Sequence, residues 1–175
     1  NNKELSFDSL KMIIEEAGKF ACDELDTINQ IGDQEGIKLE NGVVRMPESF
    51  IKAYKNFVNT GWFSIIGEKK YGGQDLPLSA VVMINEIWHS TNMSFATNNM
   101  LTQGAVELLE SHGNEKQKEY YLPNLISGKW SGTMNLTEPH AGSDLSSIKT
   151  KAIEKDKKFL IKGTKIYITH GDQDM

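Results

Sequence analysis

Hydrophobic residues recur every three to four positions through most of the first 128 residues, a spacing that places them on one face of a helix. This pattern predicts a helix over residues 7–21. It is lost from Asn29 to Met46, where glycines stand among polar residues, and this stretch is predicted to be a long loop with a short extended piece at residues 43–45. A second helix is expected to open at Pro47 and to end at Gly61, because proline suits the first turn of a helix and glycine its end.

Three more helices are predicted before residue 128. One opens at Pro77, and another runs from about Ser94 to Ser111. Asn114 is the expected N-cap of the last helix, because its side chain can accept a hydrogen bond from an unpaired amide of the first turn. Pro123 is expected to kink this helix or to end it early, since proline lacks the amide donor and its ring clashes with the preceding turn.

The hydrophobic period changes to two after Gly128. Apolar and small polar side chains alternate over residues 130–137, which is typical of a strand. Three further short stretches have the composition of strands and are separated by turn-like residues, namely residues 148–153, 159–162 and 166–169.

These patterns predict a mainly helical chain with a partial β segment. Residues 1–128 are expected to form an N-terminal helical domain, and residues 129–175 the opening strands of a β-domain. Because the sequence reaches Met175 before a sheet of that kind closes, a fragment of a longer protein is expected.

Composition excludes several classes of protein. The 175 residues are 38% hydrophobic, which argues against intrinsic disorder, and no apolar run approaches the roughly 20 residues that span a bilayer. With a net charge of −5, the chain lacks the basic surface of a nucleic-acid binder. The stretch Asn1–Glu4 has no signal-peptide pattern, and the single cysteine, Cys22, excludes an internal disulfide and is expected in the core. A cytoplasmic protein with no membrane or nucleic-acid partner is therefore expected.

A first candidate cluster for chemistry spans residues 134–144. Its glycine, Gly142, lets the backbone approach a neighbour closely, and Ser143 and Asp144 supply short hydrogen-bonding side chains. Such a loop can offer backbone amides to a polar ligand as an anion-binding nest. The alternative is a structural turn whose serine and aspartate bond their own backbone. A Ser-His-Asp hydrolase is excluded, because neighbours on one loop seldom converge as a triad requires.

A second candidate cluster spans residues 167–171. On a strand, Tyr167 and Thr169 face the same side, so an aromatic ring and a hydroxyl can meet the face and the edge of a planar cofactor. The alternative is an ordinary core tyrosine beside a surface threonine.

Together the two clusters resemble the signature pair of the acyl-CoA dehydrogenase family. The first reads Thr137-Glu138-Pro139-x-Ala141-Gly142-Ser143-Asp144, and the second, about twenty residues later, reads Lys165-Ile166-Tyr167-Ile168-Thr169-x-Gly171. The upstream order is similar too, in Tyr71-Gly72-Gly73, Gly113-Asn114-Glu115 and Tyr121-Leu122-Pro123. Within the family, the segments 36–44, 100–104 and 132–136 look most similar to the bacterial subgroup that includes methylmercaptopropionyl-CoA dehydrogenases.

The resemblance implies a flavoprotein oxidoreductase of bacterial fatty acid metabolism. Members have an N-terminal helical domain, a middle β-domain and a C-terminal bundle, and they bind FAD between domains. They oxidise an acyl-CoA thioester to the trans-2-enoyl-CoA, with electron-transfer flavoprotein as acceptor, and they form homo-oligomers. The glutamate base of the family belongs to the C-terminal bundle, so no catalytic residue is assigned in this chain, and the chain alone is expected to be inactive.

Residue by residue, the resemblance implies two sets of contacts. The FAD contacts are Met134, Leu136, Thr137, Gly142, Ser143, Tyr167 and Thr169. The acyl-CoA contacts are Ser143, Thr97, Met100, Leu101 and Gly104. Tyr167 stands where the family usually has tryptophan, and His140 occupies a variable position and is given no role. The polarity of residues 97–104 predicts a preference for short or heteroatom-bearing acyl groups.

Two alternatives stay open. One is a non-enzymatic helical interaction module whose β tail docks a partner. The other is a family relative with altered chemistry, such as an acyl-CoA oxidase or an alkylation-response flavoprotein with nucleic-acid affinity. The acidic balance of the chain argues against nucleic-acid binding.

Overall fold

The computed structural model of the protein describes residues 5–175, so the stretch Asn1–Glu4 that was searched for a leader lies outside the described residues. The chain divides into two compact units. The helical unit comprises Asn1–Gly132 with Asp172–Met175, and the motif unit comprises Thr133–Gly171. The domain boundary predicted after residue 128 stays a prediction.

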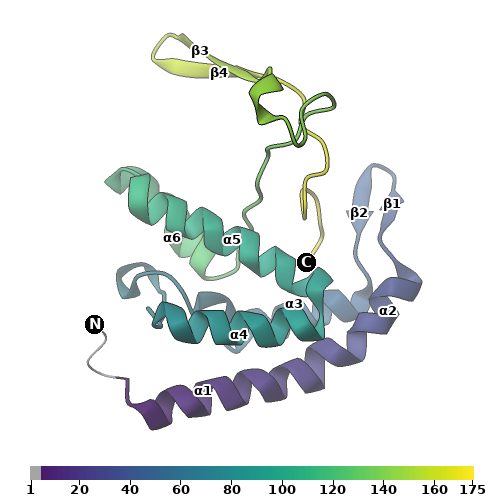
Figure 1. The fold of residues 1–175 in the computed structure, drawn as a ribbon, viewed down its shortest axis with the longest axis vertical. Coiled ribbons are helices and arrows are strands. Elements are labelled where there is room, and N and C mark those ends of the chain that lie inside the picture. The colour runs from purple at the N-terminus through teal and green to yellow at the C-terminus, as the bar shows by residue number, and fades with distance from the viewer. Residues whose placement is uncertain (1–4) are drawn as a thin grey trace. The chain divides into compact units, whose positions relative to one another are not determined.

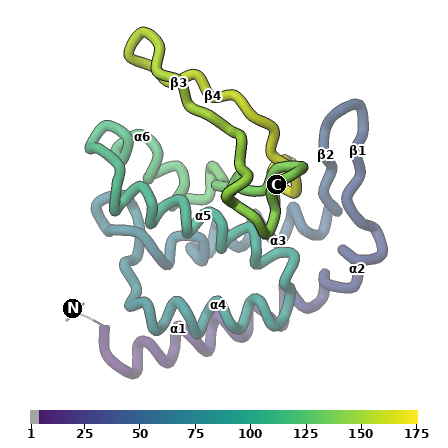
Figure 2. Tube along the Cα trace, turned by 45° about the horizontal axis from the view of Figure 1, so that its top comes forward, coloured from purple at the N-terminus to yellow at the C-terminus, as the bar shows by residue number. Residues whose placement is uncertain are grey.

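The helical unit confirms the mainly helical prediction. Its α-helices are α1 Phe7–Phe20, α2 Thr27–Glu35, α3 Glu48–Asn59, α4 Leu78–Thr91, α5 Met93–His112 and α6 Glu115–Ile126. A π-helical turn, Ala21–Asp26, joins α1 to α2, and short 3-10 helices lie at Trp62–Ser64 and Lys69–Tyr71. Helix α4 packs between α1 and α5, and α5 packs on α6 (Figures 1 and 2).

The core of the helical unit is built around the ring of Phe57. Its centroid lies 4.7 Å from that of Trp88 and 5.5 Å from that of Phe95, both edge to face. Phe20 and Phe63 complete the contacts of this ring at 5.7 and 6.1 Å. Edge-to-face geometry brings the positive edge of one ring onto the negative face of another, so the cluster is stabilised beyond its buried area. The core thereby ties α1, α3, α4 and α5 together.

The loop predicted from Asn29 to Met46 is wrong in its first part. Helix α2 continues to Glu35, because a side chain at Gly32 would occupy the position of the Phe50 ring, and its absence lets α2 pack closely on α3. Gly36 then ends the helix with φ 64°. This close packing is a tertiary effect that a local pattern does not contain.

The extended piece predicted at residues 43–45 is confirmed as strand β2, Val43–Arg45, but its partner was missed. Strand β1, Lys38–Glu40, pairs with it in an antiparallel hairpin. The turn residues Asn41 and Gly42 have φ 54° and 79°, as a two-residue hairpin turn requires.

The predicted helix starts are confirmed. Pro47 and Pro77 are the N-caps of α3 and α4. Asn114 caps α6 in a reciprocal box, in which its Oδ1 accepts from the Gln117 amide at 3.0 Å and the Gln117 Oε1 accepts from the Asn114 amide at 2.9 Å. A kink or an early end was predicted at Pro123, and the early end does not occur, because α6 continues to Ile126 and buries apolar side chains on both sides of the proline.

Cys22 is exposed, so the prediction of a core cysteine is wrong. It lies in the π-helical turn between the buried side chains of Ala21 and Leu25. The position after Ala21 turns away from the buried face of the helix.

Asp174, near the end of the sequence, is bound to the helical unit. Its carboxylate accepts from the Met46 amide at 2.8 Å and pairs with Arg45 at 3.2 Å. The Met46 amide, more than the Arg45 charge, holds the pKa of Asp174 below its ordinary value.

The motif unit contains one antiparallel hairpin, formed by β3 Lys151–Lys155 and β4 Lys158–Lys162, which confirms two of the predicted strands in outline. A 3-10 helix, Leu145–Ser147, precedes it. The strands predicted at residues 130–137 and 166–169 are wrong as strands, since neither belongs to a ladder in the part of the chain that the structure describes. An alternating pattern gives an extended chain, but a strand also needs a paired neighbour.

Candidate functional site

The two motif segments lie beside each other within the motif unit. The Ile166 amide donates to the Thr137 carbonyl at 2.9 Å, and the Lys165 ammonium donates to the Leu136 carbonyl at 2.9 Å. One more bond, from the Thr133 hydroxyl to the Thr169 carbonyl at 2.6 Å, joins their far ends. Segments 27 to 36 positions apart in sequence are thus held together by these three hydrogen bonds and by a fourth, from the Lys165 ammonium to the Glu138 carboxylate.

The carboxylate of Glu138 is the polar centre of this unit. It is 2% exposed and accepts from the Lys149 amide at 2.8 Å, from the amide and hydroxyl of Thr150, and from the Lys165 ammonium at 2.9 Å. The hydroxyl of Thr150 and the amide of Lys149 are the main causes that hold the pKa of Glu138 well below its usual range. The side chain is therefore an ionised acceptor surrounded by donors.

The sequence pattern showed Glu138 only as one member of the first motif, so its position at the centre of this cluster was not predicted. Its donors stand 11 to 27 positions away, and a glutamate between threonine and proline carries no local sign of burial. The sequence signal that could have indicated this cluster is a glutamate inside one motif and a lysine, Lys165, at the start of the other.

His140, which was given no role, also belongs to this cluster. Its Nε2 lies 3.3 Å from Glu138 Oε2 and 3.1 Å from the Ser147 carbonyl, two acceptors that require the proton on Nε2.

The loop of the first motif combines a structural turn with exposed amides. Glu138 and Ala141 exchange two backbone hydrogen bonds, of 2.9 and 3.0 Å, which close the turn. Asp144 accepts from Ser146 and Ser147, and these bonds hold its pKa below the ordinary value, so the alternative of an aspartate that bonds its own backbone is correct here. Between these two features Gly142 and Ser143 are exposed, and among residues 5–175 no group is hydrogen-bonded to their amides.

Apolar side chains of the paired segments are exposed. Met134 is 61% exposed, Leu136 38% and Tyr167 87%. The hydroxyl-bearing Thr137 and Thr169 lie on the same two segments. Exposed apolar side chains and hydroxyls on two paired segments can face a planar cofactor with a polar edge, such as an isoalloxazine.

The prediction that Tyr167 and Thr169 face the same side of a strand is wrong in its premise. It adopts φ 55°, which is uncommon for a bulky side chain, and it does not lie on a strand, so alternation does not set its direction relative to Thr169. Its exposure also contradicts the alternative of a core tyrosine.

The predicted acyl-CoA contacts of α5 share one face of the helix. Thr97, Met100, Leu101 and Gly104 follow the spacing of a helical stripe and are exposed or half-buried. The opposite face buries polar residues, and Thr102 there accepts from the Gly132 amide at 3.0 Å. Because Asn98 and Thr102 are buried on that opposite face, they do not support the prediction that the polarity of α5 selects the acyl group.

A cavity of about 380 Å³ opens between α4 and α5 beside this stripe. Met100 and Gly104 line it, together with Asn85 and Gln103, whose side chains share a hydrogen bond of 3.0 Å. The remaining Asn85 Oδ1 and Gln103 Nε2 are buried without a partner among the described residues. Two of the predicted substrate contacts therefore line a hollow whose wall also contains the Asn85–Gln103 amide pair.

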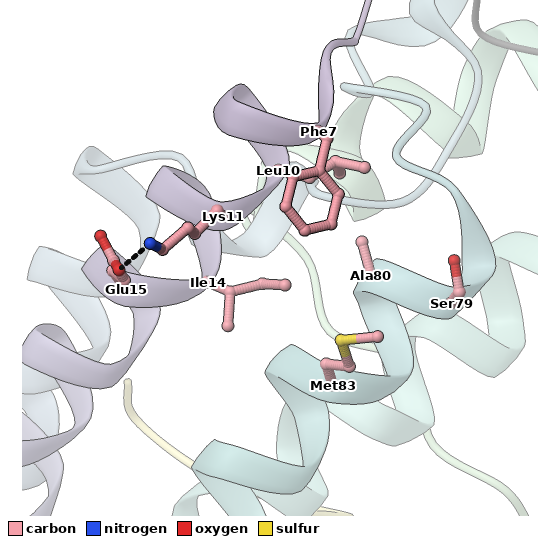
Figure 3. Close-up of a pocket in the computed structure, with 8 residues that line it drawn as sticks. All are labelled: Phe7, Leu10, Lys11, Ile14, Glu15, Ser79, Ala80 and Met83. Atoms are coloured by element: carbon pink, nitrogen blue, oxygen red, sulfur yellow. Dashed lines mark ion pairs between the residues drawn. The ribbon is translucent and has the colours of Figure 1, made fainter.

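A separate apolar groove of about 280 Å³ lies between α1 and α4 (Figure 3). The Lys11–Glu15 ion pair, at 3.8 Å, stands at its α1 side. The groove was not predicted from the sequence. Phe7, the first residue of α1, lines it and is 80% exposed. Its lining residues are Phe7, Leu10, Lys11, Ile14, Glu15, Ser79, Ala80 and Met83.

The described residues show neither a membrane span nor a metal centre. No helix among residues 5–175 has the length and apolar character needed to cross a bilayer. Over the same residues, no group of three or more histidine, cysteine, aspartate or glutamate side chains is arranged to hold a metal ion.

Comparison with known proteins gives concordant matches. The acyl-CoA dehydrogenase N-terminal domain matches residues 8–129, and the acyl-CoA dehydrogenase middle domain matches residues 133–174. A 3-methylmercaptopropionyl-CoA dehydrogenase of Ruegeria pomeroyi is 43% identical over 173 residues, which are 98% of this chain and 29% of that protein.

Two solved structures are similar in fold and sequence. An acyl-CoA dehydrogenase from Geobacillus kaustophilus has a TM-score of 0.78 at 26% identity, over 98% of this chain and 42% of that one. An acyl-CoA dehydrogenase from Bacillus anthracis, complexed with FAD, has a TM-score of 0.77 at 25% identity, over 97% of this chain and 28% of that one. The chain thus spans less than half the length of each of these relatives.

Proposed function

The chain belongs to the acyl-CoA dehydrogenase family, and we propose that it is the N-terminal part of an FAD-dependent enzyme that oxidises an acyl-CoA thioester to the trans-2-enoyl-CoA. The family matches cover both units, and one relative of similar fold is a complex with FAD. Within this proposal residues 1–128 are the helical domain, and residues 129–175 are the first part of the middle domain.

One observation carries the proposal, namely the pairing of the two motif segments, which leaves the apolar side chains of Met134, Leu136 and Tyr167 exposed. When bound, FAD supplies the redox chemistry by accepting a hydride from the substrate. In this proposal the side chains of Met134, Leu136 and Tyr167 pack against the flavin ring and exclude water from it. The hydroxyls of Thr137 and Thr169 bond its polar edge.

The remaining assignments follow the same match. Gly142 and Ser143 offer their amides to the cofactor, and Ser143 also contacts the CoA portion of the substrate. The stripe Thr97, Met100, Leu101 and Gly104 forms part of the acyl pocket. Proton abstraction from the α-carbon is assigned to a glutamate outside this sequence, since no residue here matches the family's base. The 175-residue chain alone is therefore expected to be inactive.

The partners are part of the proposal. Electron-transfer flavoprotein is the expected acceptor, and a cytoplasmic bacterial homo-oligomer is the expected form of the complete enzyme. The similarity to a 3-methylmercaptopropionyl-CoA dehydrogenase supports a short acyl group that carries a heteroatom.

The test is the colour and reactivity of the complete protein that contains this chain. We expect it to purify with bound FAD and to lose its visible absorbance when an acyl-CoA is added without oxygen. A complete protein that takes up no FAD contradicts the proposal and supports the interaction module. Rapid oxygen consumption with substrate identifies an oxidase, and salt-dependent DNA binding identifies the alkylation-response relative.

A further inference from the structure

We propose that Glu138 is a positioning residue, whose buried carboxylate holds Lys165 and thereby fixes the spacing of the two segments that face the flavin. This inference rests on the proposed function. Glu138 belongs to the first motif segment and Lys165 to the second. Glu138 itself is 2% exposed, so it acts through its neighbours and not by contact with the flavin.

The ammonium of Lys165 makes two contacts with the first segment. It lies 2.9 Å from Glu138 Oε1 and 2.9 Å from the Leu136 carbonyl oxygen. The lysine is only 20% exposed and stands two residues before Tyr167. One cation therefore holds the Leu136 carbonyl and the Glu138 carboxylate, on either side of Thr137, to the segment that carries Tyr167, and this pair of contacts is the Lys165 clamp. Any shift of Lys165 therefore moves Thr137 and Tyr167 relative to each other.

The chemistry of the cluster requires a carboxylate at position 138. Oε1 accepts from both groups of Thr150 and from Lys165, while Oε2 accepts from the Lys149 amide. Every neighbour that bonds the carboxylate is a donor, so an amide nitrogen at either position would face an N–H or O–H group. Glutamine has the right size and loses at least one of these bonds. The cluster thus discriminates between isosteric side chains by charge.

The chain offers a matched control in Lys149. Lys149 and Lys165 both donate to Glu138, but Lys149 does so only through its backbone amide, and its side chain is free to change without loss of that bond. Lys165→Met therefore removes the clamp, whereas Lys149→Met removes one positive charge from the same neighbourhood and leaves the clamp intact. Lys165→Met also leaves Glu138 its amide and hydroxyl donors, so it tests the clamp if Glu138→Gln does not fold.

The experiment uses the complete FAD-loaded protein in five forms: wild type, Glu138→Gln, Lys165→Met, Lys149→Met, and the double variant of positions 138 and 165. We measure the dissociation constant for FAD, the visible circular dichroism of the bound flavin, and kcat and KM for butanoyl-CoA. Glu138→Gln and Lys165→Met should each raise the FAD dissociation constant roughly tenfold or more, because a hydrogen bond to a charged group contributes on that scale. The double variant should exceed neither single variant by much, since both break one clamp.

A changed flavin dichroism, with kcat reduced and KM nearly unchanged at saturating FAD, supports positioning of the ring. A variant of lower thermal stability with wild-type FAD affinity and dichroism gives Glu138 a structural function alone and overturns the inference. Equal effects of Lys149→Met and Lys165→Met also overturn it. A wild-type protein without FAD refutes the proposed function instead, so the two failures are distinguishable.

Discussion

The hydroxyl of Tyr54 offers a quantitative test of how the helical unit is held together. It donates to the carbonyl of Gly128 at 2.8 Å and is buried, with 7% of the residue exposed. Gly128 has φ 73°, and a side chain there would come within 2.6 Å of Val58, so the backbone of Gly128 packs closely against that side chain. Tyr54→Phe removes the donor and leaves this carbonyl unpaired, which should lower the free energy of unfolding by about 1–3 kcal/mol.

A second magnitude follows from titration. Burial raises the pKa of Tyr54 to about 12, against about 10 for an unfolded chain. The folded state therefore holds the phenolic proton more tightly, and this contribution to stability is complete below pH 10 and is lost as the pH rises from about 10 to about 12. The difference corresponds to about 3 kcal/mol.

The assay is urea unfolding of the chain, followed by tryptophan fluorescence, at neutral pH and at steps up to pH 12. Trp62 and Trp88 report on the core, and the centroids of their rings lie 5.6 Å apart. Wild type should lose stability between pH 10 and 12 in excess of Tyr54→Phe, while effects of the other tyrosines and the lysines cancel in the comparison. Tyr120→Phe, at an exposed tyrosine, is the matched control and should change nothing. Equal alkaline loss in wild type and Tyr54→Phe would refute the reasoning.

Three further changes have defined outcomes. Gly73→Ala should cost about 3 kcal/mol in thermal unfolding, because the added Cβ would overlap the backbone of Gly67, whereas Gly104→Ala meets nothing and should stabilise α5 by up to about 1 kcal/mol. Asn114→Ala should lower the urea stability by about 1 kcal/mol through loss of the capping box, and Asn114→Asp should retain most of it; an unaffected alanine variant would contradict the cap. In the complete protein, Tyr167→Ala should weaken FAD binding about tenfold in a fluorescence titration, because the ring that stacks on the flavin is lost. Tyr167→Trp keeps an aromatic ring and should keep the FAD affinity. Equal FAD affinities of the two variants would argue against stacking.

Features that depend on neighbours in sequence were predictable. The cap at Asn114 and the prolines before α3 and α4 act within one turn of helix, so their residue types reveal them directly. The same holds for the change of period after Gly128, which marks the end of the helices. The two motifs were found as sequence patterns, although nothing local indicates that they lie side by side.

Features that depend on distant groups were not predictable. The continuation of α2 past Gly32 needs the ring of Phe50, and the continuation of α6 past Pro123 needs the burial of Leu125 and Ile126. In the same way, alternation over residues 130–137 was misread as a strand because a ladder partner lies outside any local pattern. In each of these errors, a local sequence preference was used where a tertiary contact determines the structure.

The two units are held together in different ways, which explains why the buried position of Glu138 was not predicted from the sequence. In the helical unit, shape follows from an apolar core around Phe57. In the motif unit, the residues that are buried are Ala141 and Glu138, and the hairpin of β3 and β4 exposes every one of its residues. A unit of this size without an apolar core gains little from hydrophobic burial, so its geometry depends on directional bonds to one carboxylate. Apolar side chains are left exposed in the same unit, and under the proposed function the accuracy with which they meet the flavin depends on the Glu138 cluster.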